Sequence, residues 1–288
     1  MTNEELLHLG PRAEDLYGAA KKSGIAAGDF LGPAEQAYLR TLEGRSFPAD
    51  SLYFVGGYEE AERKVAVFVS DKAVLARKNA KTEVDWDSID WEKDDWWQDV
   101  PDEKEPGEAQ PDLADAGIVV LKLTVPKGAE LPGHRDCLGS ILALGLRRQA
   151  LGDIAVTDDC VYLFVKETVA SYLESSLTKV AKSNIRLQRC DLPADFSLPR
   201  AFERKDVIVA SLRADALVAA ITGCSRETAK HFVTVGNFNR NYLPMSDPEE
   251  KLCEGDVFSL RGTGRFRLER LAGTTQKGRL KVVLQKYV

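Results

Sequence analysis

Hydroxyl and basic side chains gather at the expected start of one helix near residue 225, in an arrangement that suits phosphate binding. In the run SRETAKHFVTV, Ser225 stands where an N-cap residue belongs, so its hydroxyl would accept a hydrogen bond from a free backbone amide. Arg226 and Lys230 are four residues apart and share one face of that helix, while apolar residues form the opposite face. A cationic face beside a helix N-terminus attracts anions. The pattern therefore predicts contacts with phosphate groups.

Further basic residues extend this predicted surface. Arg213 begins the preceding helix, and Asp215 would either orient an arginine or cap the turn. On the strands that follow, Arg265 and Arg267 alternate with inward apolar residues, and Arg261 precedes a hairpin with two glycines. A single arginine on a strand is usually only solvated. Because these arginines form a set, we expect them to build a basic surface.

The distribution of charge separates this basic region from the rest of the chain. The 288 residues carry a net charge of -6, which taken alone argues against a nucleic-acid partner. Residues 83–115, however, hold 14 acids and 2 bases, whereas residues 200–288 hold 16 bases and 10 acids. One insert therefore makes the protein acidic, and the part that carries the predicted phosphate contacts is basic.

The acidic insert, residues 83–115, also contains all four tryptophans of the chain. Its density of like charge predicts a solvated, flexible loop. The alternative is a docking segment whose tryptophans anchor a protein partner while its acids repel or mimic nucleic acid. The sequence leaves both interpretations open.

The elements that must position these residues indicate an α+β protein of three modules. Residues 1–82 contain helical and strand patterns and predict a small N-terminal α/β module. Residues 116–192 read as βαββαβ, the order of a ferredoxin-like domain, which RNA-recognition (RRM-like) modules share. Residues 193–206 read as a linker because of their prolines and mixed charges, and residues 207–288 read as a helix pair on a small sheet.

Aromatic residues on the central strands of the βαββαβ module would indicate base stacking. One of these expected strands carries only Tyr162 and Phe164, and the other carries none. The pattern gives weak support for RNA binding by this module.

The last module resembles a known family. SLRADALVAAI, CSRETAKHFVTVG, the Asn241 that ends FNRN, EGDVFSLRG and GRF look like the S-four-type RNA-binding domain, which is named after a small-subunit ribosomal protein. HRDCLGSILALGLRRQALGDIAV resembles the middle domain of the bacterial YlmH family, also called RqcP, and FLGPAEQAYL with VGGYEEAER resembles its N-terminal portion. The resemblance implies a ribosome-quality-control factor that binds large subunits obstructed by peptidyl-tRNA and supports alanine tailing. Its partners would be large-subunit rRNA and tRNA.

The resemblance also implies roles for single residues. Arg213, Ser225, Arg226 and Lys230 would contact RNA, and Asn241 would stand at a strand turn. Arg240 departs from the family pattern, which has an apolar residue beside the asparagine, and a surface arginine there would add to the basic face. The expected RNA-binding set is Arg213, Ser225, Arg226, Lys230, Arg240, Asn241, Arg261, Arg265 and Arg267.

His134, Arg135 and Asp136 resemble the catalytic triplet of a kinase. The sequence lacks the glycine-rich loop, the lysine-bearing strand and the Asp-Phe-Gly motif that a kinase needs. We therefore expect Asp136 to cap a helix, and His134 and Arg135 to make a secondary RNA contact. The competing hypotheses are an RNA-modifying enzyme, for example one like a pseudouridine synthase, with its site around His134 and Asp136, and another rRNA- or tRNA-binding assembly factor.

Cysteine and histidine usage bears on metals and on the cellular compartment. Five separated cysteines without a CxxC motif, together with three histidines, predict reduced thiols and neither a metal site nor a cofactor. No apolar run approaches the roughly 20 residues of a membrane-spanning helix, and the N-terminus has no signal-peptide pattern. The sequence therefore predicts a cytoplasmic, non-catalytic RNA-binding protein with no membrane partner.

Overall fold

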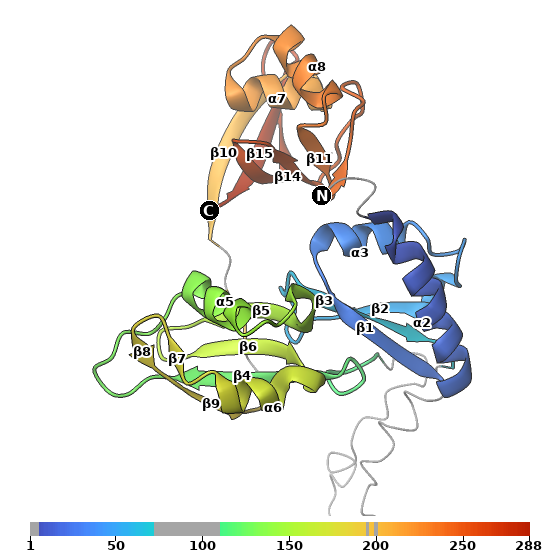
Figure 1. The fold of residues 1–288 in the computed structure, drawn as a ribbon. Coiled ribbons are helices and arrows are strands. Elements are labelled where there is room, and N and C mark those ends of the chain that lie inside the picture. Colours follow the sequence, from blue (N-terminus) through green and yellow to red (C-terminus); the bar gives the residue numbers. More distant parts are fainter. Residues whose placement is uncertain (1–5, 72–109, 194–195, 199–200) are drawn as a thin grey trace, which may run out of the picture. The chain divides into compact units, whose positions relative to one another are not determined.

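The fold is that of a computed structural model, which describes residues 6–71, 110–193, 196–198 and 201–288. The chain divides into two compact units. Unit 1 comprises Met1–Leu7, Pro33–Tyr38 and Leu198–Val288, and unit 2 comprises His8–Gly32 and Leu39–Ser197. Both units combine helices with antiparallel sheets, so the predicted α+β class is confirmed (Figure 1).

Most of the acidic insert, residues 83–109 with their four tryptophans, lies outside the described residues. Its last residues, 110–115, form a turn in which the Asp115 N–H donates to Asp112 Oδ1 at 2.8 Å. This turn leads directly into the first strand of the next sheet. Both interpretations of the insert therefore stay predictions.

Unit 2 begins with a long helix and a three-stranded sheet. Helix α2 spans Leu9–Ser23 and ends at Gly24, whose φ of 86° favours a residue without a side chain. The antiparallel sheet has the order β1-β3-β2, formed by β1 (Ile25–Leu31), β2 (Leu52–Val55) and β3 (Lys64–Val69). The sequence of β1, IAAGDFL, is poor in the β-branched residues that mark strands, so the sequence alone does not predict this strand. Helix α3 spans Pro33–Arg40, and its residues up to Tyr38 belong to unit 1.

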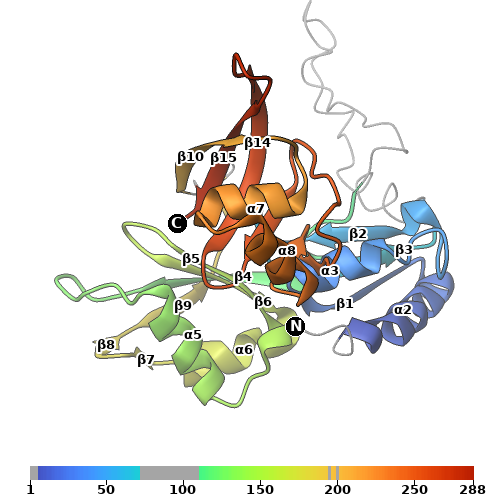
Figure 2. The same ribbon diagram turned by 90° about the horizontal axis from the view of Figure 1, so that it is seen from above.

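A second sheet of unit 2 follows the predicted βαββαβ order. Its elements are β4 (Ile118–Thr124), α5 (His134–Ala143), β5 (Leu151–Val156), β6 (Val161–Lys166), α6 (Glu167–Ser176) and β9 (Arg186–Arg189). The strands are antiparallel, in the order β5-β6-β4-β9. Helices α5 and α6 pack on one face of this sheet, where Cys137, Ile141 and Leu173 join its core (Figure 2).

Helix α6 ends earlier than its sequence pattern suggests. The run TVASYLESSLTKV is typical of a helix as far as Val180, but α6 ends at Ser176. Strands β7 (Lys179–Val180) and β8 (Ser183–Asn184) then form a two-residue hairpin. Val180 is buried in the core beneath α5, and this tertiary contact overrides the local helical pattern.

The two sheets of unit 2 are joined through Asp153 on β5. Its carboxylate accepts hydrogen bonds from the Tyr58 hydroxyl at 2.8 Å and from the backbone amides of Glu62 and Arg63 at 2.7 and 3.0 Å. Arg63 also donates through Nε to the carbonyl oxygen of Leu151 at 2.9 Å. The loop between β2 and β3 is therefore fixed to the edge of the second sheet.

Aromatic side chains fill the same junction. Phe164 is 1% exposed, and its ring lies 5.3 Å from that of Tyr58, centroid to centroid. A Cβ atom placed on Gly57 would lie 2.4 Å from the Phe164 ring, and one on Gly152 would lie 2.6 Å from Phe30. Glycine is therefore required at both positions because the rings approach the backbone closely.

Unit 1 contains a helix pair and a six-stranded antiparallel sheet. Helices α7 (Ala214–Thr222) and α8 (Arg226–Thr234) are followed by β11 (Phe238–Arg240), β12 (Leu243–Pro244), β13 (Val257–Leu260), β14 (Gly264–Thr274) and β15 (Leu280–Tyr287). The sheet has the order β10-β15-β14-β13-β11-β12. Strand β10 spans Phe202–Val209 and pairs with β15 along its whole length, so it begins inside the expected linker.

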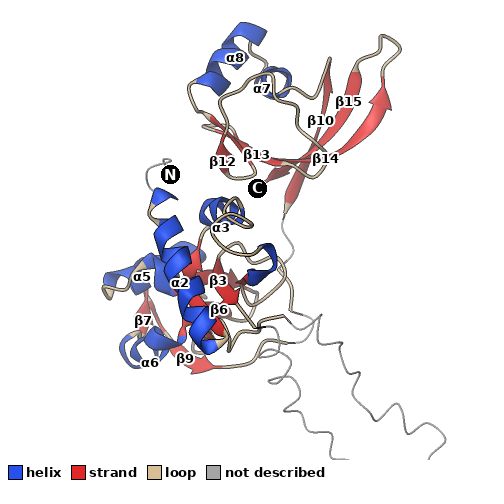
Figure 3. Cartoon of the chain, turned by 90° about the vertical axis from the view of Figure 1, so that its right-hand side faces the viewer, coloured by secondary structure: helices blue, strands red, loops and turns tan. Residues whose placement is uncertain are grey.

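One face of this sheet carries the core of unit 1 (Figure 3). Phe238, Phe258 and Phe266 stack in succession, with 5.7 Å between neighbouring ring centroids. Leu217 of α7 and Val233 of α8 belong to the same buried cluster. The helices therefore cover the phenylalanine face, and alternate residues of the strands lie on the opposite face.

Candidate nucleic-acid interface

Asp215 organises the start of the helix pair in unit 1. Its side chain is 0% exposed, and its carboxylate accepts a hydrogen bond from Arg226 Nη2 at 2.9 Å. Arg213 donates to the same carboxylate through Nε at 3.2 Å and through Nη2 at 3.0 Å. Of the two predicted roles for Asp215, the structure shows the orientation of arginines, and it does so for two of them.

The two arginines also determine the protonation of Asp215. Burial acts to raise the pKa of this carboxyl group, but the hydrogen bonds from Arg226 and Arg213 outweigh burial and lower the pKa below its ordinary value. Asp215 is therefore ionised at neutral pH. The carboxylate neutralises one of the two positive charges, and Glu249, which also pairs with Arg213, neutralises the other.

Arg213 and Arg226 differ in how much of the guanidinium remains available. Arg213 also donates to Glu249 Oε1 at 2.6 Å, and its side chain is only 25% exposed. The Arg226 side chain is 44% exposed and pairs with Asp215. Arg226 is therefore the better placed of the two to meet a phosphate, while Arg213 supports Asp215.

Ser225 is the N-cap of α8, as the sequence predicts. Its Oγ accepts a hydrogen bond from the Thr228 backbone amide at 3.1 Å, and its φ and ψ of -65° and 157° are extended. The cap places Arg226 at the first helical position. Lys230 is exposed one turn further along the same face.

Arg240 is expected on the exposed basic face, but the structure places it elsewhere. It pairs across strands with Phe258 and lies two residues from the buried Phe238, so its side chain starts from the core face of the sheet. Arg240 Nη2 lies 2.6 Å from Asp256 Oδ2, and Nη1 donates to Glu250. These two acids hold both Nη atoms of the guanidinium, so Arg240 anchors the edge of the core.

Asn241 forms the predicted turn after β11. Its φ of 47° is in the left-handed region, which asparagine tolerates better than most residues. Its Oδ1 accepts a hydrogen bond from the Val257 amide at 2.9 Å, and its Nδ2 donates to Asp256 Oδ1 at 2.8 Å. Both polar ends of the amide group are occupied in shaping the turn.

The remaining arginines of the set lie away from the helix pair. Arg265 pairs across strands with Ser259, and Arg267 with Val257, so both side chains start from the sheet face opposite Phe266. The guanidinium carbon of Arg265 lies 4.2 Å from the centre of the Tyr287 ring. Arg261 is exposed at the turn before β14. The sheet separates Arg265 and Arg267 from Arg226 because the helices cover its other face.

The central module offers an exposed helix start and a buried aromatic pair. Asp136 Oδ2 accepts a hydrogen bond from the Gly133 amide at 3.3 Å, so the predicted cap of α5 is present, and His134 and Arg135 are exposed beside it. Tyr162 is only 8% exposed, and Phe164 lies in the junction with the first sheet. These rings are therefore not available to stack on a base.

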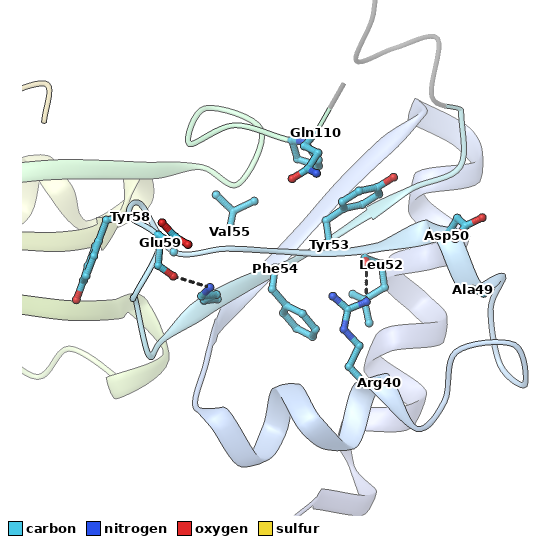
Figure 4. A pocket seen from close by; sticks show the side chains of 13 residues that line it. Arg40, Ala49, Asp50, Leu52, Tyr53, Phe54, Val55, Tyr58, Glu59 and Gln110 are labelled. Atoms are coloured by element: carbon cyan, nitrogen blue, oxygen red, sulfur yellow. Dashed lines mark hydrogen bonds between the residues drawn. The ribbon is translucent and has the colours of Figure 1, made fainter. Parts of the chain in front are cut away.

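Two pockets lie in unit 2. One of about 600 Å³ runs along β2, where Arg40 stacks 4.8 Å from the centre of the Phe54 ring and Lys64 Nζ donates to the Glu59 carbonyl oxygen at 3.3 Å (Figure 4). The other, of similar volume, lies beside Lys166, whose Nζ donates to the carbonyl oxygen of Gly28 at 2.9 Å. The second pocket is also lined by Arg12, which pairs with Asp29 at 2.8 Å, so each of these four cations already has a partner.

In the part of the chain that the structure describes, no three histidine, cysteine, aspartate or glutamate side chains gather closely enough to hold a metal ion. Burial, reinforced by the charge of Asp136, raises the pKa of Cys137 to about 11, so this thiol is a core residue and not a nucleophile. Within the same residues, no helix is long and apolar enough to cross a membrane.

Comparisons with known proteins show what the chain is similar to. Residues 111–194 match the family described as "Putative RNA-binding domain in YlmH". The chain is a homologue of "Ribosome-associated protein quality control protein P2" of Bacillus subtilis (strain 168), with 29% identity over 260 residues that cover 90% of this chain and 86% of that protein. A solved structure, "Cell division protein ylmH from Streptococcus pneumoniae", aligns with a TM-score of 0.43 and 15% identity, covering 66% of this chain and 93% of that one.

Proposed function

We propose that this protein is a non-catalytic, cytoplasmic RNA-binding factor that acts on large ribosomal subunits obstructed by peptidyl-tRNA and supports alanine tailing of the stalled chain. Homology to a ribosome-associated quality control protein over 90% of the chain carries this proposal. The match of residues 111–194 to an RNA-binding domain of YlmH is consistent with it. The partners would be large-subunit rRNA and tRNA.

The architecture supports the same proposal. The sheet order β5-β6-β4-β9, with α5 and α6 on one face, is the arrangement of a ferredoxin-like domain. We assign unit 1 from residue 202 onward to the S-four type, because a helix pair covers one face of its sheet and exposes the capped start of α8.

The chemistry proposed for unit 1 is phosphate recognition. Asp215 holds the Arg226 guanidinium at the N-terminus of α8, where free backbone amides add partial positive charge. Lys230 continues the cationic face by one helical turn. Such a surface recognises the backbone and shape of structured RNA more than its base sequence.

Co-sedimentation tests the proposal. The full chain is mixed with purified large ribosomal subunits that either carry or lack peptidyl-tRNA. We expect the protein to sediment with the subunits and to favour those that carry peptidyl-tRNA. Failure to sediment with either form would overturn the ribosomal assignment.

An RNA-modifying enzyme remains the second candidate, with its site around His134 and Asp136. The carboxylate of Asp136 is already used as a helix cap, which disfavours a catalytic role. A His134→Ala variant that retains RNA binding but loses a base modification, detected by mass spectrometry of bound RNA, would support the enzyme.

A further inference from the structure

One end of the central module gathers basic side chains from three segments that are distant in the sequence. The segments are the loop after β4 with the start of α5, the β7-β8 hairpin, and the start of β9. Ser183 of the hairpin donates through Oγ to the Glu130 carbonyl oxygen at 2.9 Å, which ties the hairpin to the loop. Thr124 pairs across strands with Arg186, which places β9 beside the end of β4. Figures 1 and 2 both show these segments at the same end of the module.

The charge of this end is predominantly positive. Residues 125–136 and 178–187 contain five lysines and arginines against two acids. We name the exposed members the basic end: Lys127, His134, Arg135, Lys179, Lys182 and Arg186. Of the two acids, Asp136 is used as the cap of α5. Among the described residues, none of the five lysines and arginines forms an ion pair.

Two further acids, Asp158 and Asp159, occupy the turn between β5 and β6 at the same end of the sheet. They are on the far edge, because the strand order places β6 and β4 between β5 and β9. Strands are spaced by about 4.8 Å, so β5 and β9 are about 14 Å apart. That distance exceeds the screening length of about 8 Å at physiological salt. These acids therefore leave the field at β9 positive.

The backbone holds the basic end in a fixed shape. Val180 is buried in the core, so the hairpin is anchored against α5. The two-residue turn of the hairpin places Lys182 at its tip, and Ala181 has a φ of 51°, which an L-residue rarely adopts. Lys179 and Lys182 therefore extend from a rigid base, which lowers the entropy cost of contacting a partner.

We infer that the basic end is a second RNA-binding surface, which contacts the phosphate backbone of structured RNA independently of the helix pair in unit 1. The inference rests on the proposed function, because the RNA in question is that of the large ribosomal subunit. Exposed, unpaired lysines and arginines supply the sequence-independent, salt-dependent part of RNA binding. Two linked surfaces also raise the overall affinity, since binding through one increases the local concentration of the other.

A double charge reversal tests the inference in the full chain. The variant Lys179→Glu with Lys182→Glu changes the hairpin, and the control Lys22→Glu with Arg45→Glu changes net charge by the same amount at two exposed positions elsewhere in unit 2. Binding to purified large ribosomal subunits, and separately to a 20-base-pair RNA hairpin, is measured over a range of KCl concentrations. Circular dichroism melts confirm that both variants fold.

The inference predicts a specific pattern. The hairpin variant should bind both probes at least tenfold more weakly, and its slope of log affinity against log salt should be shallower by about 2, as for two lost phosphate contacts. The control should stay within about twofold of the wild-type affinity. Equal losses in variant and control would overturn the inference, because they would reflect net charge alone.

The two probes separate this inference from the proposed function. If the wild type fails to bind subunits but binds the RNA hairpin through Lys179 and Lys182, the ribosomal assignment fails and the RNA surface stands. If the variant loses subunit binding but keeps hairpin binding, the basic end contacts a ribosomal protein and the inference is wrong. A variant that does not fold is replaced by Lys182→Ala at the hairpin tip, read by the same salt slope.

Discussion

Asp215 and Arg226 join the first turns of two successive helices through a hydrogen bond of 2.9 Å between a buried carboxylate and a half-exposed guanidinium. The bond fixes one edge of the arginine and leaves another edge toward solvent. An arginine held this way loses less conformational entropy when it meets a phosphate than a free side chain would. The carboxylate is thus a positioning group for the proposed RNA contact.

Replacement of Asp215 by asparagine should destabilise unit 1. The variant Asp215→Asn keeps the shape of the side chain but leaves Arg213 and Arg226 without their shared anion. Hydrogen bonds to charged groups contribute about 1.5–3 kcal/mol each, so we expect the free energy of unfolding to fall by about 2 kcal/mol. Urea denaturation measures the change. Asp206→Asn is the matched control, because its pair with Arg204 is exposed and should leave the urea midpoint unchanged.

The lowered pKa values of Asp215 and Asp256 predict a loss of stability in acid. Burial acts to raise the pKa of Asp256, but the Cys253 amide, Asn241 and Arg240 outweigh it. A carboxyl group whose pKa is lowered by folding stabilises the fold fully above its unfolded pKa of about 4, and this stabilisation is lost as the pH falls through the folded value. The thermal unfolding midpoint should therefore decrease more between pH 6 and pH 3 for the wild type than for Asp215→Asn. Equal drops would contradict the assignment.

Arg226→Ala should weaken RNA binding with a characteristic salt dependence. One lost phosphate contact makes the slope of log affinity against log salt shallower by about 1. Filter binding to large-subunit rRNA at several KCl concentrations measures the slope. An unchanged slope would remove Arg226 from the interface.

Arg240→Ala is the informative comparison for that experiment. The Arg240 guanidinium is bonded to Asp256 and Glu250, so its loss should lower the thermal midpoint but leave the salt slope unchanged. A shallower slope for the folded variant would return Arg240 to the RNA-binding set.

Ser225→Ala should lower the free energy of unfolding by about 1 kcal/mol, because the Thr228 amide loses its acceptor. Ser225→Asp should retain stability, since a carboxylate caps the helix equally well. Chemical denaturation of the two variants compares them. If both variants lose stability alike, the hydroxyl serves a purpose other than capping.

Gly152→Ala should disrupt the junction inside unit 2. The added methyl group would approach both Phe30 and Phe164 to less than 3 Å, and such overpacking costs about 1–3 kcal/mol. Gly139→Ala is the control, because Gly139 lies in α5 with open space around it and alanine favours helix there by up to about 1 kcal/mol. Thermal melts should move in opposite directions for the two variants.

Local signals predict the start of α8 correctly. The cap, the helix and the shared face of Arg226 and Lys230 depend on residues within five positions of one another, and the structure confirms the cap and the helix. The same holds for the cap of α5 by Asp136. Spacing along the chain is sufficient to predict a contact when both partners are close in the sequence.

The sequence does not predict the environment of a side chain when its burial depends on residues that are distant in the chain. Arg240 looks like a surface residue because its type is charged, but the register of β11 places it on the core face beside acids 10 and 16 residues away. Arg265 and Arg226 look like one basic set, although a sheet lies between them. The members of the basic end come from three segments, so spacing along the chain relates only Arg135 and His134 to each other.

The junction around Asp153 has a consequence for how the protein can be divided. Phe164 and Tyr162 lie on the face of the second sheet that α5 and α6 leave uncovered. Tyr58 of the first sheet's loop packs on Phe164, and Phe196 packs on both rings. A fragment limited to residues 111–194, the extent of the matched family, would expose these rings to water and would be prone to aggregate. We therefore expect a fragment that begins near α2 to fold and stay soluble where one that begins at residue 111 does not.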